Sequence, residues 1–477
     1  MKEYEIVIGL EVHVELSTSS KIFCGCSTKF SVDPNSNCCP VCTGMPGALP
    51  VLNKKAIEYA VAVGLALNCD ITMNTMFDRK NYFYPDLPKA YQISQLHFPL
   101  AQNGQVKIKS ADKEKSIGIH EIHLEEDAGK LIHDSDNNNT LVDYNRAGVP
   151  LIEIVSQPDM RSSEEVLAYL DKLKSTLQYL GVSDCKMQEG SMRVDINLSV
   201  REVGAKSLGT RTEIKNLSSF KSITRAIESE SKRQIEIIKN GGHVALETRR
   251  FDDISNENTR MRTKEKIEDY RYFTDPDLPP IELSEELTNK IKSSLPEFRE
   301  EKIIRFQKTY KIPKYNAEVL TSSKKIADIF EKTANICNMP KEVSNWLMVE
   351  GMRIIKENNM DLWEIDFSPE KFSKLILMIE EGKINRTIAK EVFEKIFLED
   401  IDPEEYVDKH SLGMISDDKE LRNTVLRVLD NNPKSVSDYK KGKTKALGYL
   451  VGQTMKEMDG RADPSQINKI LIEHIEQ

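Results

Sequence analysis

Apolar and polar side chains alternate in several short segments of the first 280 residues. In a β-strand, residues two apart lie on the same face, so this alternation predicts strands with one apolar and one polar face. The pattern is clearest in the segments 10–16, 117–126, 192–200 and 211–215, and the apolar segment 151–155 carries a single acid. One such strand is ordinary, because any antiparallel strand with a wet face gives the same alternation.

The polar faces of these five segments are unusual together, because they concentrate Glu, His, Asp and Asn. Residue parity groups Glu11, His13 and Glu15; Glu121, His123 and Glu125; Glu153; Arg193, Asp195 and Asn197; and Arg211, Glu213 and Lys215. A solvated face usually mixes Lys, Thr and Ser instead. Hard cations such as Mg²⁺ prefer oxygen ligands, with nucleotide phosphates completing the shell. The sequence therefore favours a carboxylate-lined sheet that could hold a metal-bound nucleotide.

From about residue 287 onward, apolar residues recur at helical spacing and strand signals are few. Within the first part, helices are also expected at 53–67, 163–180 and 219–240. The second of these follows Ser162 and has Glu164 and Glu165 in its first turn, a pattern that caps a helix N-terminus. The fold class predicted is α+β, with an antiparallel sheet followed by all-α domains.

Two boundaries divide the chain into three predicted domains. The segment 275–286 has three prolines in six residues and is interpreted as a linker. A second boundary is expected near 402–408, before a small helical tail. The predicted domains are 1–285, 286–405 and 406–477.

No glycine-rich phosphate-binding loop accompanies the acidic strands. A GKT triplet occurs at 442–444, but Ser437 stands where the first glycine of such a loop is required. No G-x-G-x-x-G motif follows a predicted strand. If the chain uses ATP, it does so through metal ions on the sheet.

Five of the eight cysteines lie between Cys24 and Cys42. Two close pairs of thiolates suit a tetrahedral structural zinc site, here Cys24, Cys26, Cys39 and Cys42. Cys38 is a spare thiol whose part in the site stays open. The alternative is a group of reduced cysteines without a metal, but the spacing favours zinc as a loop staple.

Two further segments mix basic and aromatic residues. Segment 78–92 includes Arg79, Lys80, Lys89, Tyr82, Phe83, Tyr84 and Tyr91. Cations bind phosphates and rings stack on bases, which suits a nucleotide or a tRNA end, although a loop packed on the core explains the mixture equally well. The segment 269–277 is similar and weaker. In the tail, a candidate phosphate-contacting patch, or simply a solvated charge run, consists of Lys440, Lys441, Lys443 and Lys445.

The overall charge limits these interpretations. A formal net charge of −9 argues against a dedicated nucleic-acid binder, so any RNA contact must be local. No apolar run is long enough to span a bilayer, and acidic residues interrupt the apolar N-terminus, unlike in a signal peptide. No membrane partner is expected, and the expected location is the cytoplasm.

Six longer motifs are specific enough to carry a family resemblance. They are GLEVHVEL at 9–16, DRKNYFYPDLPKAYQISQ at 78–95, HLEEDAGK at 123–130, DYNRAGVPLIEIVSQPD at 143–159, ETRRFD at 247–252 and KGKTKALGYLVGQTMKE at 441–457. Together they resemble the B-subunit family of the aspartyl/glutamyl-tRNA amidotransferases, over essentially the whole chain. The related archaeal subunit has an inserted domain that this chain lacks, so the bacterial or organellar type is expected.

The resemblance implies a fold and a reaction. The fold is a glutamine-synthetase-like cradle, then a helical domain, then a tRNA-binding tail. The activity is that of a carbon–nitrogen ligase with glutamine as amido donor. ATP phosphorylates the side-chain carboxylate of Glu-tRNA(Gln), Asp-tRNA(Asn) or both, and ammonia then forms the amide.

The resemblance also implies cofactors, partners and site residues. ATP, Mg²⁺ and structural Zn²⁺ are expected, together with misacylated tRNA. The partners are a glutaminase of the amidase type, the A subunit, and a small C subunit in the same heterotrimer. The magnesium and catalytic residues implied are Glu11, His13, Glu125 and Glu153, with Lys80 catalytic and nucleotide-binding beside Arg79, Tyr82 and Tyr84.

Two other functions fit parts of the pattern. A free-standing metal-dependent ligase acting on a small carboxylate would explain the acidic sheet, but not the basic helical tail. A zinc-stapled RNA-binding adaptor would explain the cysteines, but acidic faces repel phosphate unless they hold a metal. The chain has no glutaminase signature of its own, so ammonia must come from another chain. ATP hydrolysis stimulated by misacylated tRNA would separate the three functions.

Overall fold

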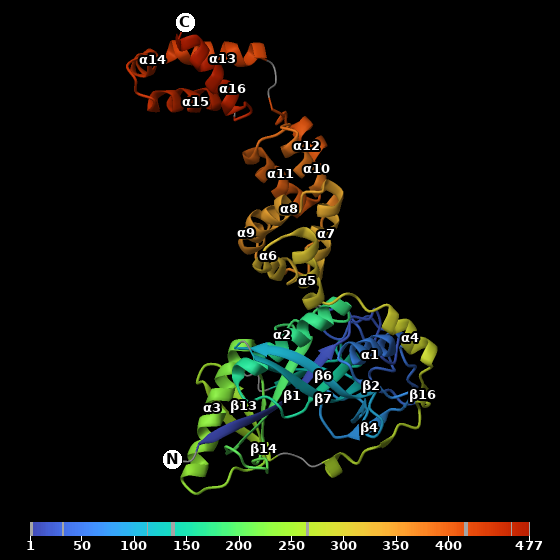
Figure 1. Ribbon diagram of the computed structural model, residues 1–477. Coiled ribbons are helices and arrows are strands. Elements are labelled where there is room, and N and C mark those ends of the chain that lie inside the picture. Colours follow the sequence, from blue (N-terminus) through green and yellow to red (C-terminus); the bar gives the residue numbers. More distant parts are fainter. Residues whose placement is uncertain are drawn as a thin grey trace. The chain divides into compact units, whose positions relative to one another are not determined.

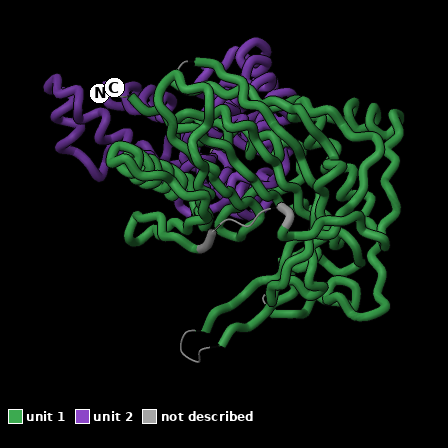
Figure 2. The backbone as a smooth tube through the Cα atoms, turned by 90° about the horizontal axis from the view of Figure 1, so that it is seen from below, with its two compact units in different colours: residues 1–298 green, residues 299–477 purple. Residues whose placement is uncertain are grey.

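The computed structural model describes residues 3–30, 33–111, 113–134, 139–263, 267–414, 418–458 and 460–476. The chain divides into two compact units, Met1–Phe298 and Arg299–Gln477 (Figures 1 and 2). The first unit is mixed α+β, and every described element of the second is a helix. No helix in the described ranges is long and apolar enough to cross a membrane.

A nine-stranded sheet forms the centre of the first unit (Figure 1). Its order is β14 (Glu257–Thr263), β13 (Glu247–Asp252), β12 (Thr212–Lys215), β11 (Met192–Glu202), β1 (Tyr4–Glu15), β10 (Pro150–Ser156), β7 (Lys113–Glu126), β6 (Ala101–Ser110) and β2 (Asp70–Ile71). All neighbours are antiparallel except β12 and β13, which run parallel. The mixed fold with a mostly antiparallel sheet is confirmed, and all five predicted strands lie in this one sheet.

One face of the sheet is apolar and is covered by helices. Val12 of β1 pairs with Ile154 of β10 and Val194 of β11, and all three side chains are buried in the first core. Apolar residues of α1 (Lys54–Ala66), α2 (Ser163–Leu180) and α3 (Phe220–Lys239) complete that core. The opposite face is left to the polar residues.

All three predicted helices of the first unit are confirmed, and each begins at a capping side chain. Asn53, Ser162 and Ser219 accept hydrogen bonds from backbone N–H groups in the first turns of α1, α2 and α3. Such caps satisfy donors that have no partner within the helix. The second helix ends at Gly181, whose φ of 71° is accessible to glycine at little cost.

The described residues also form three smaller sheets. The first joins β4 (Asp78–Asn81), β5 (Tyr91–Ser94) and β15 (Phe273–Thr274), the second joins β3 (Asn74–Thr75) and β16 (Ile281–Glu282), and the third joins β8 (Lys130–Asp134) and β9 (Asn139–Asp143). A short 3₁₀ helix spans Ile267–Tyr270.

The segment 275–286, interpreted as a linker, is instead packed into the first unit. Leu278 and Leu283 are buried in the first core, and β16 pairs with β3. The following helix, α4 (Glu285–Ser293), adds Ile291 to the same core. These apolar contacts belong to the first unit, which extends to Phe298.

The second unit contains two separate apolar clusters. The first lies among α5 (Arg299–Tyr310), α6 (Lys314–Leu320), α7 (Lys324–Cys337), α8 (Pro340–Trp346), a π-helix (Leu347–Gly351), α9 (Met352–Glu357), α10 (Pro369–Glu380), α11 (Arg386–Glu399) and α12 (Pro403–Lys409). The second lies among α13 (Asp418–Asn431), α14 (Pro433–Lys440), α15 (Lys445–Glu457) and α16 (Pro464–Glu476). The division into three domains stays a prediction, which the three separate clusters support.

Phe393 lies at the centre of the first of these helical clusters. It is fully buried, with ring centroids 4.9 Å from Phe372 and 5.4 Å from Trp346. Phe393→Ala is expected to lower the free energy of unfolding of this unit by about 3–5 kcal/mol, because it removes the ring and leaves a cavity. Both tryptophans of the chain, Trp346 and Trp363, lie in the second unit, so urea unfolding followed by tryptophan fluorescence measures it directly.

The matched control is Tyr315→Ala, whose ring is 67% exposed. It is expected to change the same free energy by no more than about 0.5 kcal/mol. Equal unfolding midpoints for the two variants would contradict the packing described for Phe393.

Candidate functional site

The polar face of the sheet carries two groups of potential metal ligands. In the first, His13, Glu125 and Glu153 offer ligand atoms that all lie within 4.8 Å of one another. Strand register explains this proximity, because His13 of β1 pairs directly with Glu153 of β10. Glu125 lies on β7, the strand next to β10. It pairs with Leu151, two residues before Glu153.

The second group consists of Glu11, Asp195 and Glu213, again within 4.8 Å of one another. Glu11 of β1 pairs with Asp195 of β11, and Glu213 comes from β12, the next strand. Asn197 donates a 2.9 Å hydrogen bond to Glu11. The strands β1, β11 and β12 thus assemble this group as β1, β10 and β7 assemble the first.

Of the four residues predicted to share one magnesium site, the structure brings three together and places Glu11 in the second group. Glu11 and His13 are two residues apart on β1, so they share a face but stand roughly 7 Å apart along the strand. Sequence parity put Asp195 and Glu213 on the polar face without identifying them as ligands. The missing information was strand order, which places β11 and β12 beside β1. A single four-ligand site stays a prediction.

The first group holds one buried carboxylate, Glu125, and one half-buried carboxylate, Glu153, around one imidazole. His13 Nε2 lies 3.7 Å from Glu153 Oε2 and 4.0 Å from Glu125 Oε1. Burial raises the pKa of Glu125, and the neighbouring charge of Glu153 raises it further. Burial acts in the same direction on Glu153, but His13, His123 and Lys80 hold the pKa of that carboxyl below its ordinary value. The pKa of Glu125 is therefore raised and that of Glu153 lowered, although the two carboxyls are neighbours.

The second group already contains a cation. Lys215 Nζ contacts Asp195 and lies 3.3 Å from Glu213 Oε1. Burial would lower the pKa of Lys215, but these two carboxylates hold it well above its usual value. Thr248 donates a 2.7 Å hydrogen bond to Glu213. The ammonium group of Lys215 thus compensates part of the negative charge.

Lys80 and a set of tyrosines stand beside the first group. Lys80 Nζ lies 5.6 Å from the ring centroid of Tyr82 and 5.0 Å from that of Tyr270. Its charge acts on Glu125 and Glu153. Burial raises the pKa of Tyr82, and the Glu125 charge adds to this effect. The two basic–aromatic segments, 78–92 and 269–277, are adjacent because β4 pairs with β15.

Arg79 and Tyr84 are placed differently from Lys80 and Tyr82. Arg79 makes ion pairs of 3.0 Å with Asp275 and 2.7 Å with Asp277, and its guanidinium stacks 4.2 Å from the Tyr91 ring. These contacts join two distant parts of the chain and occupy the guanidinium. Tyr84 is 54% exposed. Neither residue belongs to the two acidic groups.

A cavity of about 900 Å³ opens beside the second acidic group. Asp195 of the second group and its ion-pair partner Lys215 line it. Its basic lining residues are Lys29, Lys130, Arg146, Arg193 and Lys215. Arg193 pairs across the sheet with His13 of the first group and donates a 2.8 Å hydrogen bond to Asp127. The cavity therefore combines cations suited to phosphates with a carboxylate wall.

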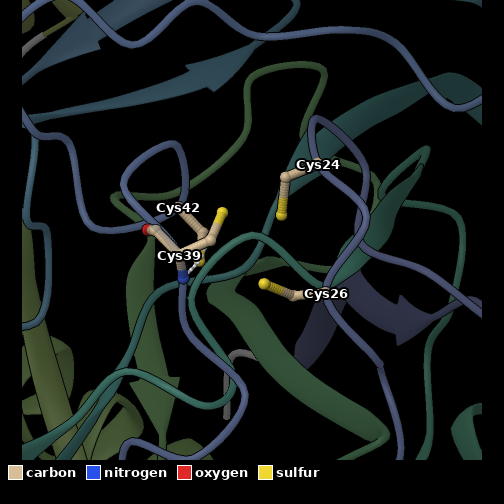
Figure 3. Close-up of side chains that lie close together, drawn as sticks. All are labelled: Cys24, Cys26, Cys39 and Cys42. Carbon is tan, nitrogen blue, oxygen red and sulfur yellow. Dashed lines mark hydrogen bonds between the residues drawn. The ribbon is translucent and has the colours of Figure 1, made fainter.

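The four predicted zinc ligands converge (Figure 3). The sulfur atoms of Cys24, Cys26, Cys39 and Cys42 all lie within 4.8 Å of one another, from two loops that face each other. The hydrogen bond from Cys24 lowers the pKa of Cys42 to about 4, helped against burial by the Cys39 amide and by Lys21. Four thiols in this arrangement fit a tetrahedral zinc ion. Cys38 lies outside the group, with its sulfur 3.9 Å from Asn145 Oδ1.

The four tail lysines lie around one turn between α14 and α15. Lys440 ends α14, Lys445 begins α15, and all four side chains are exposed. Lys443 pairs with Asp438 at 3.0 Å. Apolar residues of α15 and of its C-terminal end pack in the tail cluster, namely Leu447, Leu450, Val451, Met455 and Met458.

Comparisons with known proteins bear on this geometry. Residues 6–289 match the family model described as the GatB/GatE catalytic domain, and residues 328–475 match the one described as the GatB domain. The B subunit of the aspartyl/glutamyl-tRNA(Asn/Gln) amidotransferase of Lachnoclostridium phytofermentans is 63% identical, over 99% of both chains. This chain belongs to that B-subunit family. The corresponding protein of Agathobacter rectalis is 59% identical, over 99% of this chain and 100% of that one.

Family membership agrees with the resemblance found in the motifs. The catalytic-domain match covers both acidic groups and all four clustered cysteines, and the second match covers the tail lysines. The boundary between the two units, after Phe298, lies in the stretch between the two matches.

Glu125→Gln is expected to stabilise the protein in magnesium-free buffer. The raised pKa of Glu125 means that the folded state binds its proton more tightly than the unfolded state, where the ordinary value is 4.5. The wild type consequently loses stability as the pH rises above about 4.5, and a neutral amide removes that loss. Urea unfolding followed by circular dichroism should show a higher midpoint for the variant at about pH 8 and a smaller difference near pH 5.

Glu114→Gln is the control, because Glu114 is exposed on the same strand, β7. Its midpoint should follow that of the wild type at both pH values. If Glu125→Gln also followed the wild type, the repulsion between Glu125 and Glu153 would be too weak to matter.

Proposed function

We propose that this chain activates the side-chain carboxylate of Glu-tRNA(Gln), Asp-tRNA(Asn) or both, using ATP, so that ammonia can convert it to an amide. As a member of the B-subunit family, the chain is a ligase and part of an amidotransferase. The observation that carries the proposal is the pair of acidic groups, side by side on one sheet face, with a large cavity lined by Asp195 of the second group.

The chemistry requires an activated carboxyl group, because ammonia does not displace a carboxylate oxygen unaided. In the proposed reaction, a carboxylate oxygen attacks the γ-phosphorus of ATP, and ADP leaves. Ammonia then attacks the carbonyl carbon of the acyl phosphate, the C–O bond to phosphate breaks, and inorganic phosphate and a proton are released. Phosphoryl transfer of this kind depends mainly on positioning and on neutralising charge.

The donor sets of both groups fit hard divalent cations. His13, Glu125 and Glu153 would hold one Mg²⁺, and Glu11, Asp195 and Glu213 a second, so that Glu11 would bind another ion than in the single site first predicted. Magnesium bound there would neutralise the charge of the phosphates during transfer. Lys80 would bind the nucleotide or the substrate, and the rings of Tyr82 and Tyr270 would exclude water from the acyl phosphate.

The finer parts of the fold and assembly belong to the same proposal. The sheet would be a glutamine-synthetase-like cradle, followed by a helical domain and a tRNA-binding tail. Arg79 and Tyr84 remain proposed nucleotide-binding residues, although Arg79 is held by Asp275 and Asp277. Ammonia would come from the amidase, the A subunit, and a small C subunit would complete a heterotrimer. The isolated chain should then make no amide from glutamine.

Removal of the Glu125 carboxylate is the sharpest test of the reaction. With the assembled complex, Glu125→Gln should lower both tRNA-stimulated ATP hydrolysis and amide formation from free ammonia by at least about 100-fold, the scale on which one electrostatic interaction stabilises a transition state. Glutamine hydrolysis by the partner should fall less. Glu114→Gln on the same strand should leave all three rates unchanged, and a folded, fully active Glu125 variant would remove Glu125 from the site.

Zinc binding is tested by a pair of cysteine variants. Metal analysis of the purified chain should find one zinc, because four thiols suit a closed tetrahedral site. Cys42→Ser should lose the metal, whereas Cys38→Ser should keep it, since Cys38 points toward Asn145 instead. A metal-free wild type with four freely titrating thiols would argue for the alternative of reduced cysteines.

The tail is tested by the salt dependence of tRNA binding. Replacing Lys441 and Lys445 by alanine should weaken binding and reduce the slope of log K against log salt by about 0.7–0.9 for each phosphate that the variant no longer neutralises. The control replaces Lys456 and Lys469, which are exposed elsewhere in the tail and change the charge equally. Identical affinities and slopes for the two double variants would exclude the lysine patch as a contact site.

A further inference from the structure

The loop that carries Cys39 and Cys42 is hydrogen-bonded to the end of the β8–β9 hairpin. The backbone N–H of Asn35 donates a 2.9 Å hydrogen bond to Asp143 Oδ1, and its side-chain amide donates a 3.0 Å hydrogen bond to the Val142 carbonyl. The Tyr144 N–H donates back to Asn35 Oδ1 at 2.8 Å. The two segments therefore exchange hydrogen bonds in both directions across more than 100 residues of sequence.

Asn145 extends this connection toward the cysteines. Its Oδ1 accepts a 2.8 Å hydrogen bond from the Asn37 N–H, and its Nδ2 donates to the Asp33 carbonyl at 2.8 Å. Cys38, next to the zinc-ligand candidate Cys39, points at the same Oδ1. One side chain thus ties the cysteine loop to the segment 142–148.

Lys21 makes a second connection from the cysteines to that segment. It is fully buried, and its Nζ lies 3.6 Å from Cys42 Sγ and 3.2 Å from the Tyr144 carbonyl oxygen. Its neighbour Ile22 donates a backbone hydrogen bond to the Gly148 carbonyl. A buried ammonium group needs negative partners, and thiolates would provide them.

The segment 142–148 in turn carries Arg146 into the wall of the large cavity. Arg146 donates hydrogen bonds to the carbonyls of Ala128 and Gly129, at 3.0 Å and 2.8 Å, and its Nε lies 3.5 Å from Asp127 Oδ2. Asp127 also accepts from Arg193, the cross-strand partner of His13. The Gly148 N–H donates to the Asp127 carbonyl.

We infer that the cysteine site positions the wall of the substrate cavity: its loop fixes segment 142–148, and with it Arg146, Asp127 and Arg193 beside the first acidic group. Lys21, Asn35 and Asn145 are the positioning residues of this connection. The inference deepens the proposed function, because it gives the cysteines a part in substrate binding. A staple without such a part would hold only its own two loops.

Hydrogen exchange of the full-length chain tests the connection without ATP or tRNA, so its outcome is independent of the proposed reaction. Removing the metal with a chelator, verified by metal analysis, should increase amide exchange in peptides that cover 139–149 and 123–129. The peptides of α2 should exchange as before. Unchanged exchange in 139–149 after proven loss of zinc would overturn the inference.

Zinc affinity tests Lys21 separately. Lys21→Met keeps the length of the side chain and removes its charge, and it should weaken zinc binding in a chelator competition by about 10–100-fold, as removal of an outer partner of a metal ligand does. Lys54→Met, an exposed lysine of the same unit, should leave the affinity unchanged. Should Lys21→Met fail to fold, Asn35→Ala, which touches no thiol, provides the exchange experiment instead.

Kinetics distinguish positioning from mere stability. Asn145→Ala should retain one zinc per chain. It should raise the KM for ATP or misacylated tRNA by roughly 3–10-fold and change kcat less. Arg146→Gln should raise the KM for the same substrate. The double variant should be no worse than Arg146→Gln alone, because both changes act through one contact. Leu49→Ala, exposed in the cysteine loop, is the control. Fully additive effects on KM would show that Asn145 does not act through Arg146.

Discussion

Negative charge on one face of the nine-stranded sheet is the constraint on which the first unit depends. The opposite face is buried under three helices, and a shift of the strands by one residue would turn every carboxylate into that core. The strands therefore cannot slide to relieve repulsion between Glu125 and Glu153. The apolar packing holds these like-charged side chains close together, and this arrangement favours the binding of cations.

The faces of the strands were predictable because alternation is a local property. Val12 is buried and His13 is partly exposed because adjacent residues of a strand face opposite sides of the sheet, and β1 and β11 show this alternation along their pairing. The order of the strands is not local. Only the pairing of β1 with β10 on one side and β11 on the other separates His13 from Glu11, and no pattern within β1 contains that information.

The same limit applies to the tertiary contacts of the basic and proline-rich segments. Arg79 has the surroundings of a phosphate ligand in sequence, but Asp275, 196 residues away, forms its ion pair. The prolines near residue 280 suggested a linker, yet Leu278 and Leu283 between and after them are buried. A motif predicts which contacts a side chain can make, whereas the tertiary fold determines which residue lies next to it.

Three acidic pairs on and beside the sheet face differ in how their charge is compensated. Arg193 and Arg146 hold the pKa of Asp127 near 2, although burial raises that of its neighbour Glu15 to about 8. Lys215 serves the pair Asp195 and Glu213. Among the described residues, the ion pairs of Glu125 and Glu153 are with histidines alone. The ammonium group of Lys80 acts on both carboxyls, but in the described part of the chain it forms no ion pair with either of them. That pair is consequently the one whose charge most requires a cation from outside the chain.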